Sequence, residues 1–311
     1  MNVYKLKEKT CCGIVLYNPE IQVLKRNVEA LIEQVDSFVL IDNCSENRSD
    51  IEHLISDYNS EKITYIVNEK NFGIARALNQ ILQFADEKGY QWYLTMDQDS
   101  KCCVNLIEEY SKIVNSIDDI GILCPFILNN NKITFDEYKN MKLPTFEYVK
   151  EPIMCITSGC LNQVKAAKEI GGYHDELFID YVDGEFNILM LKNGYKIVRV
   201  NSAFMYQTMG KGREIFLFCK LYQFTGKKFF QSLQVSPVYA DKRLYYIARN
   251  SKYLRKRYGK DAGKRMTGFW MFGQIMYYFL TYPKERSRVQ MFKSVMKGLH
   301  DSKGIKGSNE N

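Results

Sequence analysis

The sequence predicts an α/β fold: a Rossmann-like, mainly parallel sheet flanked by helices, with a basic helical extension at the C-terminal end. Three observations lead to this prediction. In the first half of the chain, short apolar runs alternate with segments of helical periodicity, repeating roughly every thirty residues. Polar residues follow several of these runs directly. Beyond residue 210 the pattern becomes helical and mixes basic with aromatic side chains.

Apolar runs predict buried strands at 12–17, 37–41, 63–67, 92–96, 121–128, 153–157 and 195–200. Apolar residues at helical spacing predict helices at 19–34, 51–58, 71–84 and 182–192. A loop is expected at 129–131 and a polar, irregular segment at 132–152. Strands that alternate with helices in this order favour right-handed crossovers between parallel strands.

The composition, with 46% hydrophobic and 25% charged residues, is that of a globular protein. The nine cysteines include no C-x-x-C pair, which fits neither a zinc ribbon nor a disulfide framework and favours a reducing cytosol. The polar first ten residues argue against a signal peptide. No apolar stretch approaches the roughly 18 residues that mark a membrane span, so a soluble or membrane-peripheral protein is expected.

Polar residues follow four of the expected strands: Tyr17-Asn18, Asp42-Asn43, Asn68 to Gly73, and Asp97-Gln98-Asp99. Ligands of α/β sheets bind beyond the carboxyl ends of the strands, so these residues should converge on one crevice if the strands are neighbours. Asp42 and Asn43 could read the edge of a pyrimidine base, although a plain strand-to-helix turn is the alternative. Gly73 and Arg76 could receive a phosphate at a helix N-terminus.

Asp97 and Asp99 are candidate ligands of a divalent metal. Two carboxylates one residue apart at a strand end can turn toward one Mg²⁺ or Mn²⁺, which commonly bridges carboxylates to substrate phosphates. Such a metal would neutralise a diphosphate leaving group. The alternative is a turn, in which paired aspartates are common.

A second acidic cluster, Phe178 to Phe186, contains Asp180, Asp183 and Glu185. Asp183 is the candidate general base, which would accept a proton from an attacking sugar hydroxyl. Asp180 and Glu185 would orient it or bind substrate. The alternative is that these carboxylates cap the helix that follows.

Together these residues resemble the family 2 glycosyltransferases with a GT-A fold, and more narrowly the bacterial rhamnosyltransferase group that builds surface polysaccharides. The resemblance runs from about Cys12 to Gly210. Its markers stand in order: Tyr17-Asn18-Pro19, Asp42-Asn43-Cys44-Ser45, Asn68, Asn71 to Asn79, Asp97-Gln98-Asp99-Ser100, Ser158-Gly159, Gly171-Gly172-Tyr173, Phe178 to Asp183, and Lys192-Asn193-Gly194-Tyr195.

The resemblance implies an inverting transfer from dTDP-L-rhamnose or another pyrimidine-diphosphate sugar, with Mg²⁺ or Mn²⁺ as cofactor and Asp183 as base. A UDP-hexose donor, or a catalytically weak sugar-nucleotide-binding module, is the alternative. The donor-binding residues it implies are Tyr17, Asn18, Asp42, Asn43, Asn71, Gly73, Arg76, Asp97, Gln98 and Arg249. The acceptor-binding residues are Gly159, Asp180 and Glu185, and the metal ligands are Asp97, Asp99 and Gln207.

Residues 1–210 would form the catalytic domain, with the donor bound in 1–100 and the acceptor and base in 101–210; residues 211–311 would form the extension. Two positions depart from the family pattern. Gln207 stands where members often carry a histidine that joins the metal, and Leu189 where many carry an arginine. The three histidines, His53, His174 and His300, form no metal spacing. His174 precedes the Asp180 cluster and could contact the acceptor, but an ordinary surface histidine is the favoured interpretation.

The extension is strongly basic: from Asp241 onward there are 17 Lys and Arg against 5 Asp and Glu. Its Tyr, Phe and Trp residues favour two interpretations, a solvated helix packed on the catalytic domain or an interfacial helix on an anionic membrane. A saccharide or lipid-linked saccharide acceptor at the cytoplasmic face of a bacterial inner membrane would suit the second. No motif supports binding of nucleic acid.

Other functions fit less well. A nucleotidyltransferase would be expected to begin with a glycine-rich phosphate loop, where Tyr17-Asn18-Pro19 stands. A dinucleotide oxidoreductase is disfavoured because no G-x-G-x-x-G follows a strand. A non-enzymatic sugar-binding or partner module stays open because of Gln207.

Overall fold

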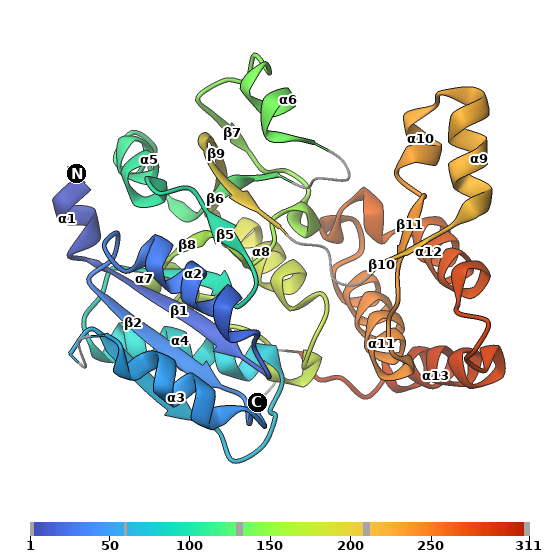
Figure 1. Ribbon diagram of the computed structural model, residues 1–311, viewed down its shortest axis with the longest axis horizontal. Helices are drawn as coiled ribbons and strands as arrows, with labels where there is room; N and C mark the ends of the chain where they lie inside the picture. The colour runs from blue at the N-terminus through green and yellow to red at the C-terminus, as the bar shows by residue number, and fades with distance from the viewer. Residues whose placement is uncertain (1–2, 59–60, 129–132, 208–211, 308–311) are drawn as a thin grey trace. The chain divides into compact units, whose positions relative to one another are not determined.

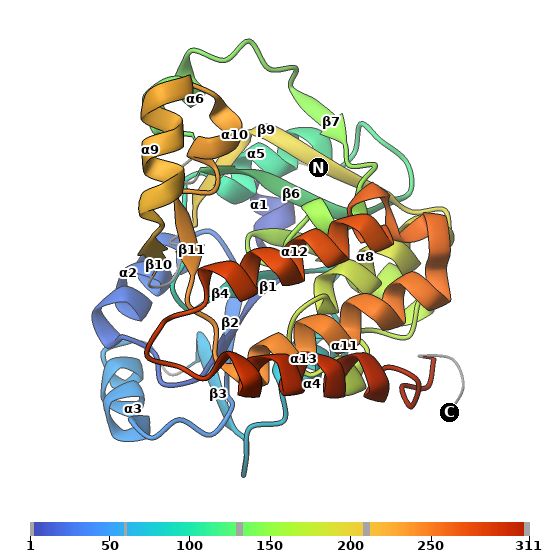
Figure 2. The same ribbon diagram turned by 90° about the vertical axis from the view of Figure 1, so that its right-hand side faces the viewer.

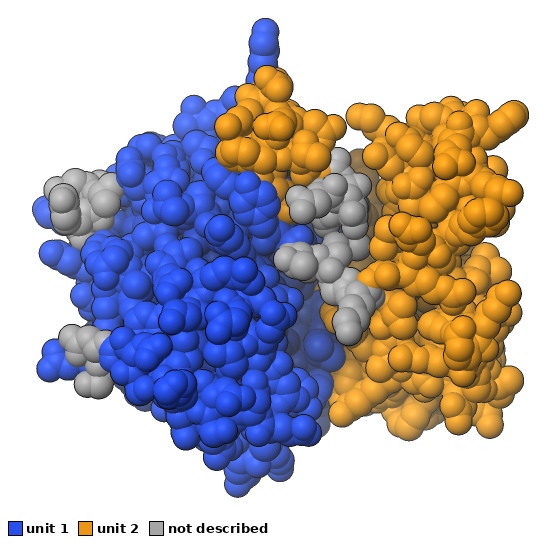
Figure 3. Space-filling model, in the orientation of Figure 1, with its two compact units in different colours: residues 1–127, 142–207, 306–311 blue, residues 128–141, 208–305 orange. Residues whose placement is uncertain are grey.

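The structure of the protein, a computed structural model, describes residues 3–58, 61–128, 133–207 and 212–307 (Figure 1). The chain forms two compact units (Figure 3). Unit 1 comprises residues 1–127, 142–207 and 306–311, and unit 2 comprises residues 128–141 and 208–305. The loop expected at 129–131 lies outside the described residues.

Nine strands of the described residues form one sheet in unit 1, and its first half is parallel. The order β3-β2-β1-β4 is built from β1 (Thr10–Leu16), β2 (Ser37–Asp42), β3 (Ile63–Val67) and β4 (Trp92–Asp97). Leu16 pairs with Asp42, and Val15 pairs with Asp97. The carboxyl ends of these strands therefore meet at one edge, as the sequence predicts.

Helices cover both faces of the parallel half (Figure 1). One face of β1, with Cys12, Ile14 and Leu16, belongs to a buried cluster that includes apolar residues of α2 (Ile21–Leu31) and α3 (Arg48–Ser56). On the other face, α4 (Ile74–Glu87) approaches so closely that a Cβ atom on Gly13 would lie 2.2 Å from Cγ2 of Ile81. The predicted doubly covered α/β sheet is confirmed.

Four described strand pairs in the second half of the sheet are antiparallel. This half contains β5 (Lys101–Cys102), β6 (Ile120–Leu128), β7 (Phe146–Tyr148), β8 (Cys160–Gln163) and β9 (Lys196–Tyr206). The helices of this region are α1 (Val3–Lys7), α5 (Leu106–Ile113), α7 (Val164–Glu169), α8 (Val182–Lys192) and the short 3-10 turns η1 (Pro152–Met154) and η2 (Asp175–Leu177).

Two local predictions are wrong. The strand expected at 153–157 is replaced by η1, because Pro152 lacks the N–H that a strand needs and starts a turn instead; the strand begins only at Cys160. The segment 132–152, expected to be irregular, holds β7 and the helix α6 (Phe135–Lys139) of unit 2. A capping box between Thr134 and Glu137 closes the first turn of α6.

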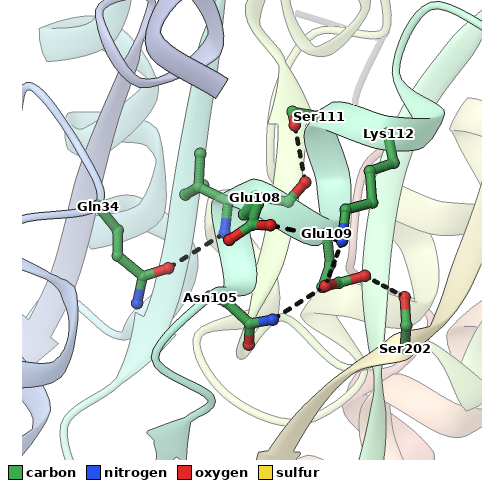
Figure 4. A network of polar contacts seen from close by, with 8 residues as sticks. Gln34, Asn105, Glu108, Glu109, Ser111, Lys112 and Ser202 are labelled. Atoms are coloured by element: carbon green, nitrogen blue, oxygen red, sulfur yellow. Dashed lines mark hydrogen bonds and ion pairs between the residues drawn. The ribbon is translucent and has the colours of Figure 1, made fainter. Parts of the chain in front are cut away.

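A buried carboxylate, Glu109, ties α5 to β9 (Figure 4). It accepts hydrogen bonds from Nζ of Lys112 at 2.7 Å, from Oγ of Ser202 at 2.5 Å and from Nδ2 of Asn105 at 2.9 Å. Burial by itself would raise the pKa of Glu109, but these hydrogen bonds hold that pKa below its ordinary value. The ionised form is therefore part of the folded state.

Glu109→Gln is expected to lower the free energy of unfolding by about 1–3 kcal/mol at neutral pH. A carboxyl group with a depressed folded-state pKa stabilises the fold above its unfolded pKa, near 4.3, and this contribution is lost as the pH falls through the folded pKa. Urea unfolding from pH 7 to pH 3 should show the two proteins converging in acid. Glu108→Gln is the control, because Glu108 is half exposed and lies 3.6 Å from Lys112, so little change is expected.

Unit 2 contains the helical extension that the sequence predicts, together with two short strands that it does not (Figure 2). The strands are β10 (Gly212–Glu214) and β11 (Val235–Pro237), which pair antiparallel. The helices are α9 (Phe216–Thr225), α10 (Lys228–Gln231), α11 (Asp241–Tyr258), α12 (Gly268–Thr281) and α13 (Arg288–Asp301), with the 3-10 turns η3 (Gly259–Ala262) and η4 (Lys264–Met266).

Close packing of α11 on α13 holds unit 2 together: a Cβ atom on Gly298 would lie 2.3 Å from the carbonyl oxygen of Tyr245. Among the residues that the structure describes, no helix combines the length and apolar character needed to cross a bilayer.

Candidate active site

The ends of β1 and β4 are joined by a side-chain amide. The N–H of Tyr17 donates to Oε1 of Gln98 at 2.8 Å, and Nε2 of Gln98 donates to the carbonyl of Tyr17 at 3.2 Å. Asn18, at φ +47°, continues the turn: its N–H donates to Oγ of Ser45 at 2.9 Å. These contacts leave the Tyr17 ring 50% exposed at the carboxyl edge.

Asp42 is fully buried at the end of β2. Its Oδ1 accepts the N–H of Ser45 and its Oδ2 accepts the hydroxyl of Tyr65, both at 2.8 Å. The guanidinium of Arg48 lies 3.7 Å away. In the structure Asp42 therefore builds the strand-to-helix turn, and its predicted contact with a base stays a prediction.

Asn43 organises the loop before α4. Its Oδ1 accepts the N–H of Phe72 at 3.0 Å, and its Nδ2 donates to the carbonyl of Gly73 at 3.0 Å and to Oδ1 of Asn71 at 3.1 Å. The exposed Arg76 lies with its guanidinium carbon 4.4 Å from the Phe72 ring centroid. The predicted donor residues Asn43, Asn71, Gly73 and Arg76 thus belong to one structural unit at the start of α4.

The start of α4 touches the loop that leads to the candidate base. The N–H of Ile74 donates to the carbonyl of Phe178 at 2.6 Å. Gly73 has φ +89°, and a Cβ atom there would lie 2.7 Å from the same carbonyl oxygen. Phe178, Asp180 and Tyr181 also have positive φ, near +60°, which is strained for residues with side chains. Tertiary contacts such as these hold the strained loop in place.

Gly73→Ala is expected to cost about 3 kcal/mol of stability and to lower activity, because it combines backbone strain with a clash against Phe178. Gly89→Ala is the matched control: Gly89 has φ +74°, but no atom lies within 4 Å of the added Cβ. It should show the strain alone, about 1 kcal/mol. Thermal melts and turnover assays of both variants would check this. Equal losses in the two would contradict the role given to the Gly73–Phe178 contact.

The backbone of Asp97 is held at the end of β4. Its N–H donates to Oγ of the buried Ser158 at 3.0 Å, and its carbonyl accepts Nδ2 of Asn27 at 2.7 Å. Asp99 is exposed in the turn that follows. Sequence reasoning missed Asn27, although an amide within the apolar stripe of α2 is a visible signal.

The metal ligands that the sequence predicts are two carboxylates and one amide. Asp97 and Asp99 supply carboxylate oxygens, which suit Mg²⁺ and Mn²⁺. Within the described ranges, no group of three or more His, Cys, Asp or Glu is placed to hold a metal. This is compatible with a metal that takes its remaining ligands from water and a diphosphate. Gln207 is partly buried after β9, and Thr208 to Gly210 lie outside the described residues.

Asp183 lies in the first turn of α8, where its Oδ1 accepts the N–H of Gly184 at 2.8 Å. Burial raises the pKa of Asp183 to about 6; the Gly184 N–H opposes this shift, and the charge of Asp180 adds to it. This places the titration of a candidate base close to neutral pH.

The charges of both Asp97 and Asp183 act on the buried thiol of Cys160. A hydrogen bond with Cys155 lowers the pKa of the Cys160 thiol, and burial raises it. The charges of Asp183 and Asp97 raise it further. Ser158, two residues before Cys160, accepts the N–H of Asp97. Gly159, beside Cys160, donates its N–H to the Thr95 carbonyl at 2.8 Å.

His174 and Glu185 form a buried pair, and Glu185 follows Asp183 by two residues in α8. Nδ1 of His174 and Oε2 of Glu185 are 2.8 Å apart, and the two residues are 9% and 1% exposed. The expectation of a surface histidine at His174 is wrong, because α8 covers it. The Glu185 carboxylate faces His174, and its contact with an acceptor stays a prediction. Leu189 of the same helix is also buried.

A cavity of about 670 Å³ lies elsewhere in unit 1. Trp92 and Gln163 line it, so it opens at the amino end of β4, away from Asp97. Arg249 belongs to α11 of unit 2, where its guanidinium lies 4.8 Å from the Tyr246 ring centroid. Its predicted contact with the donor stays a prediction.

Residues 11–170 match the profile of the family described as Glycosyl transferase family 2. The chain belongs to this family. The family 2 chain is also 28% identical, over 206 residues, to the dTDP-rhamnosyl transferase RfbF of Shigella flexneri; the match covers 63% of the chain and 68% of that relative. The resemblance found in the sequence is thus confirmed.

Solved glycosyltransferase structures share the fold of this family 2 member. Staphylococcus aureus TarS 1-349 in complex with UDP-GlcNAc superposes with a TM-score of 0.58 at 12% identity, covering 95% of this chain and 87% of TarS 1-349. The Pyrobaculum calidifontis mannosyltransferase PcManGT, in complex with GDP-Man and Mn²⁺, gives 0.53 at 11% identity, with 97% and 76% covered. GalNAc-T7 with UDP, GalNAc and Mn²⁺ gives 0.52 at 17% identity, and this chain spans only 58% of it. At these identities the likeness concerns the fold alone.

Proposed function

We propose that this glycosyltransferase moves L-rhamnose from dTDP-rhamnose to a saccharide or lipid-linked saccharide acceptor, with inversion at the anomeric carbon. The observation that carries the proposal is that Asp97, held at the end of β4, and Asp183, whose pKa burial raises, both act electrostatically on one thiol, Cys160. A single displacement needs one carboxylate on the donor side, here Asp97, and one that can accept a proton near neutral pH, here Asp183. The choice of dTDP-rhamnose as the donor is supported by the similarity to the dTDP-rhamnosyl transferase RfbF.

Each side of the site has its own task. Asp183 accepts the proton of the acceptor hydroxyl as that oxygen attacks the anomeric carbon, while the bond to the diphosphate breaks. Tyr17 and the loop from Asn71 to Arg76 hold the nucleotide and its phosphates. Asp180 and Gly159 contact the acceptor. The buried His174–Glu185 pair positions the first turn of α8, which carries Asp183.

A divalent metal would be held by Asp99 and Asp97, with Gln207 as a neutral third ligand. Bound there, Mn²⁺ or Mg²⁺ would neutralise the charge that develops on the diphosphate. Asp97 is suited to this task because the Ser158 hydroxyl and the Asn27 amide fix its backbone.

A UDP-hexose donor is the second candidate. It is favoured by solved structures of similar fold that are complexes with UDP or UDP-GlcNAc. A sugar-nucleotide-binding module of low activity is the third, because Gln207 offers only an amide where a histidine is usual.

The test is a panel of nucleotide sugars in a thermal-shift assay with Mn²⁺, followed by turnover assays on any sugar that binds. A bound donor raises the melting temperature by mass action. The largest shift is expected with dTDP-rhamnose. A larger shift with a UDP-hexose would select the second candidate, and binding without turnover on any acceptor would select the third.

A further inference from the structure

The outer face of α12 is apolar. Phe269, Phe272, Met276 and Leu280 are 86%, 63%, 40% and 66% exposed. They are three or four residues apart, so they lie on one side of the helix. Met271 lies on another side of α12 and is buried. A row of exposed large apolar side chains on a folded helix marks an interaction surface.

The helices α9 and α13 of unit 2 also expose large apolar side chains. No residue of α9 is buried, and its Phe216 and Phe224 are 71% and 91% exposed. The rings of Phe218 in α9 and Tyr277 in α12 have centroids 6.2 Å apart, so these two helices lie together. In α13 Val289, Phe292 and Met296 repeat the exposed helical spacing.

Basic side chains accompany these apolar residues. The Lys220 ammonium lies 4.5 Å from the centroid of the Phe216 ring, and the Arg288 guanidinium carbon lies 5.7 Å from that of Phe279. Lys227, Lys284 and Lys293 are exposed nearby in sequence. We call these exposed apolar residues of α9, α12 and α13, together with the basic residues beside them in the chain, the aromatic face.

We propose that the aromatic face binds the surface of an anionic membrane. Aromatic rings are suited to the headgroup region, and Lys and Arg to lipid phosphates. A second copy of the chain is a poorer partner, because a self-complementary contact would bring the basic residues of both copies together. The absence of a membrane-spanning helix among the described residues makes this binding peripheral.

The structure places the aromatic face more narrowly than the basic composition of the extension does. The face begins at α9, before the basic segment that starts at Asp241, and rests on exposed helix sides that composition does not reveal. The proposal goes beyond the proposed transfer reaction and does not depend on it, since membrane binding is measured without donor or acceptor. It would bring a lipid-linked acceptor and the enzyme to the same surface.

The test is flotation of the full chain with vesicles of phosphatidylcholine alone and of phosphatidylcholine with phosphatidylglycerol. Binding to the anionic vesicles is expected, with weakening as salt is raised. Phe269→Ser/Phe272→Ser should lower the partition coefficient on the order of a hundredfold, since each buried Phe contributes about tenfold or more. Lys284→Gln/Lys293→Gln should weaken binding to anionic vesicles only.

The control is Val104→Ser/Tyr148→Ser in unit 1, which removes two side chains that are 82% and 50% exposed outside the aromatic face. It should bind vesicles like the parent protein. Equal recovery of the parent protein with neutral and anionic vesicles would overturn the proposal, as would equal losses in the control and the Phe variant. A dimer seen by light scattering that dissociates in Phe269→Ser/Phe272→Ser, without vesicle binding, would overturn it in favour of a second copy.

Discussion

Asp183→Asn is expected to lower turnover by about 10²–10⁴-fold and at the same time to make the protein more stable above pH 6. The loss of turnover follows from the proposed role, because an amide cannot accept the proton of the acceptor hydroxyl. Donor binding should be retained, since Asn has the shape of Asp and the donor is held by other residues. Parent activity should fall as the pH drops below about 6, where Asp183 takes up a proton.

The gain in stability follows from the direction of the pKa shift. Burial raises the pKa of Asp183 to about 6, so the folded state favours the protonated form. Its favourable contribution is present below the unfolded pKa, near 3.9, and is lost as the pH rises through 6. At pH 7 the ionised carboxylate therefore weakens the fold, and a neutral amide removes that cost, about 1–3 kcal/mol.

Thermal melts at pH 5 and pH 8, together with steady-state turnover, check both parts. Asp50→Asn is a matched control, because Asp50 also lies in the first turn of a helix but is exposed. It should lose a few tenths of a kcal/mol and no activity. Full turnover in Asp183→Asn would remove Asp183 from the base role. Unchanged stability at pH 8 would show that its carboxylate is solvated.

Removal of divalent metal is the second large effect expected. A chelator should abolish turnover, and Mn²⁺ or Mg²⁺ should restore it. Asp99→Asn should lower turnover by roughly 10²-fold or more, because a metal contributes several kcal/mol to a transition state that carries developing charge. The thermal shift that donor and Mn²⁺ produce together should shrink in this variant, while the melting temperature of the free protein stays unchanged.

Asp118→Asn is the control for Asp99→Asn, since Asp118 is exposed in unit 1 outside the candidate site. It should respond to donor and metal like the parent protein. Unaltered turnover in chelator would contradict the metal role. If the thermal shift by the donor is smaller in Asp99→Asn than in the parent protein, and by the same amount with and without Mn²⁺, Asp99 contacts the donor and not the metal.

Some strands and helices are predicted correctly from the sequence and others are not. The strand at 63–67 and the helix at 182–192 are predicted with the observed bounds, because an apolar run or an amphipathic period is a local property. The strand expected at 153–157 is wrong, because Pro152 and the pairing of Cys160 with Thr95 move it along the chain. Pairing between distant segments leaves little trace in local composition.

In the candidate site, too, the sequence identifies single residues but not the contacts between distant elements. Asp97, Asp99 and Asp183 could be proposed from the sequence, because acidic residues at strand ends and helix starts stand out. Ser158 and Asn27 could not be assigned to Asp97, since each reaches it from a distant element. The partners of Asp42 could not be assigned either: its buried carboxylate accepts hydrogen bonds from Ser45 and Tyr65.

The sequence by itself determined the α/β class, the membership of family 2 and the acidic candidates for the site, because these depend on periodicity and residue type. Tertiary structure alone decided that the charges of Asp97 and Asp183 act on one thiol, Cys160, and that burial raises the pKa of Asp183. It also decided that the apolar sides of α9 and α12 stay exposed. Proximity, solvation and exposure arise only when distant segments pack, so no local pattern contains them.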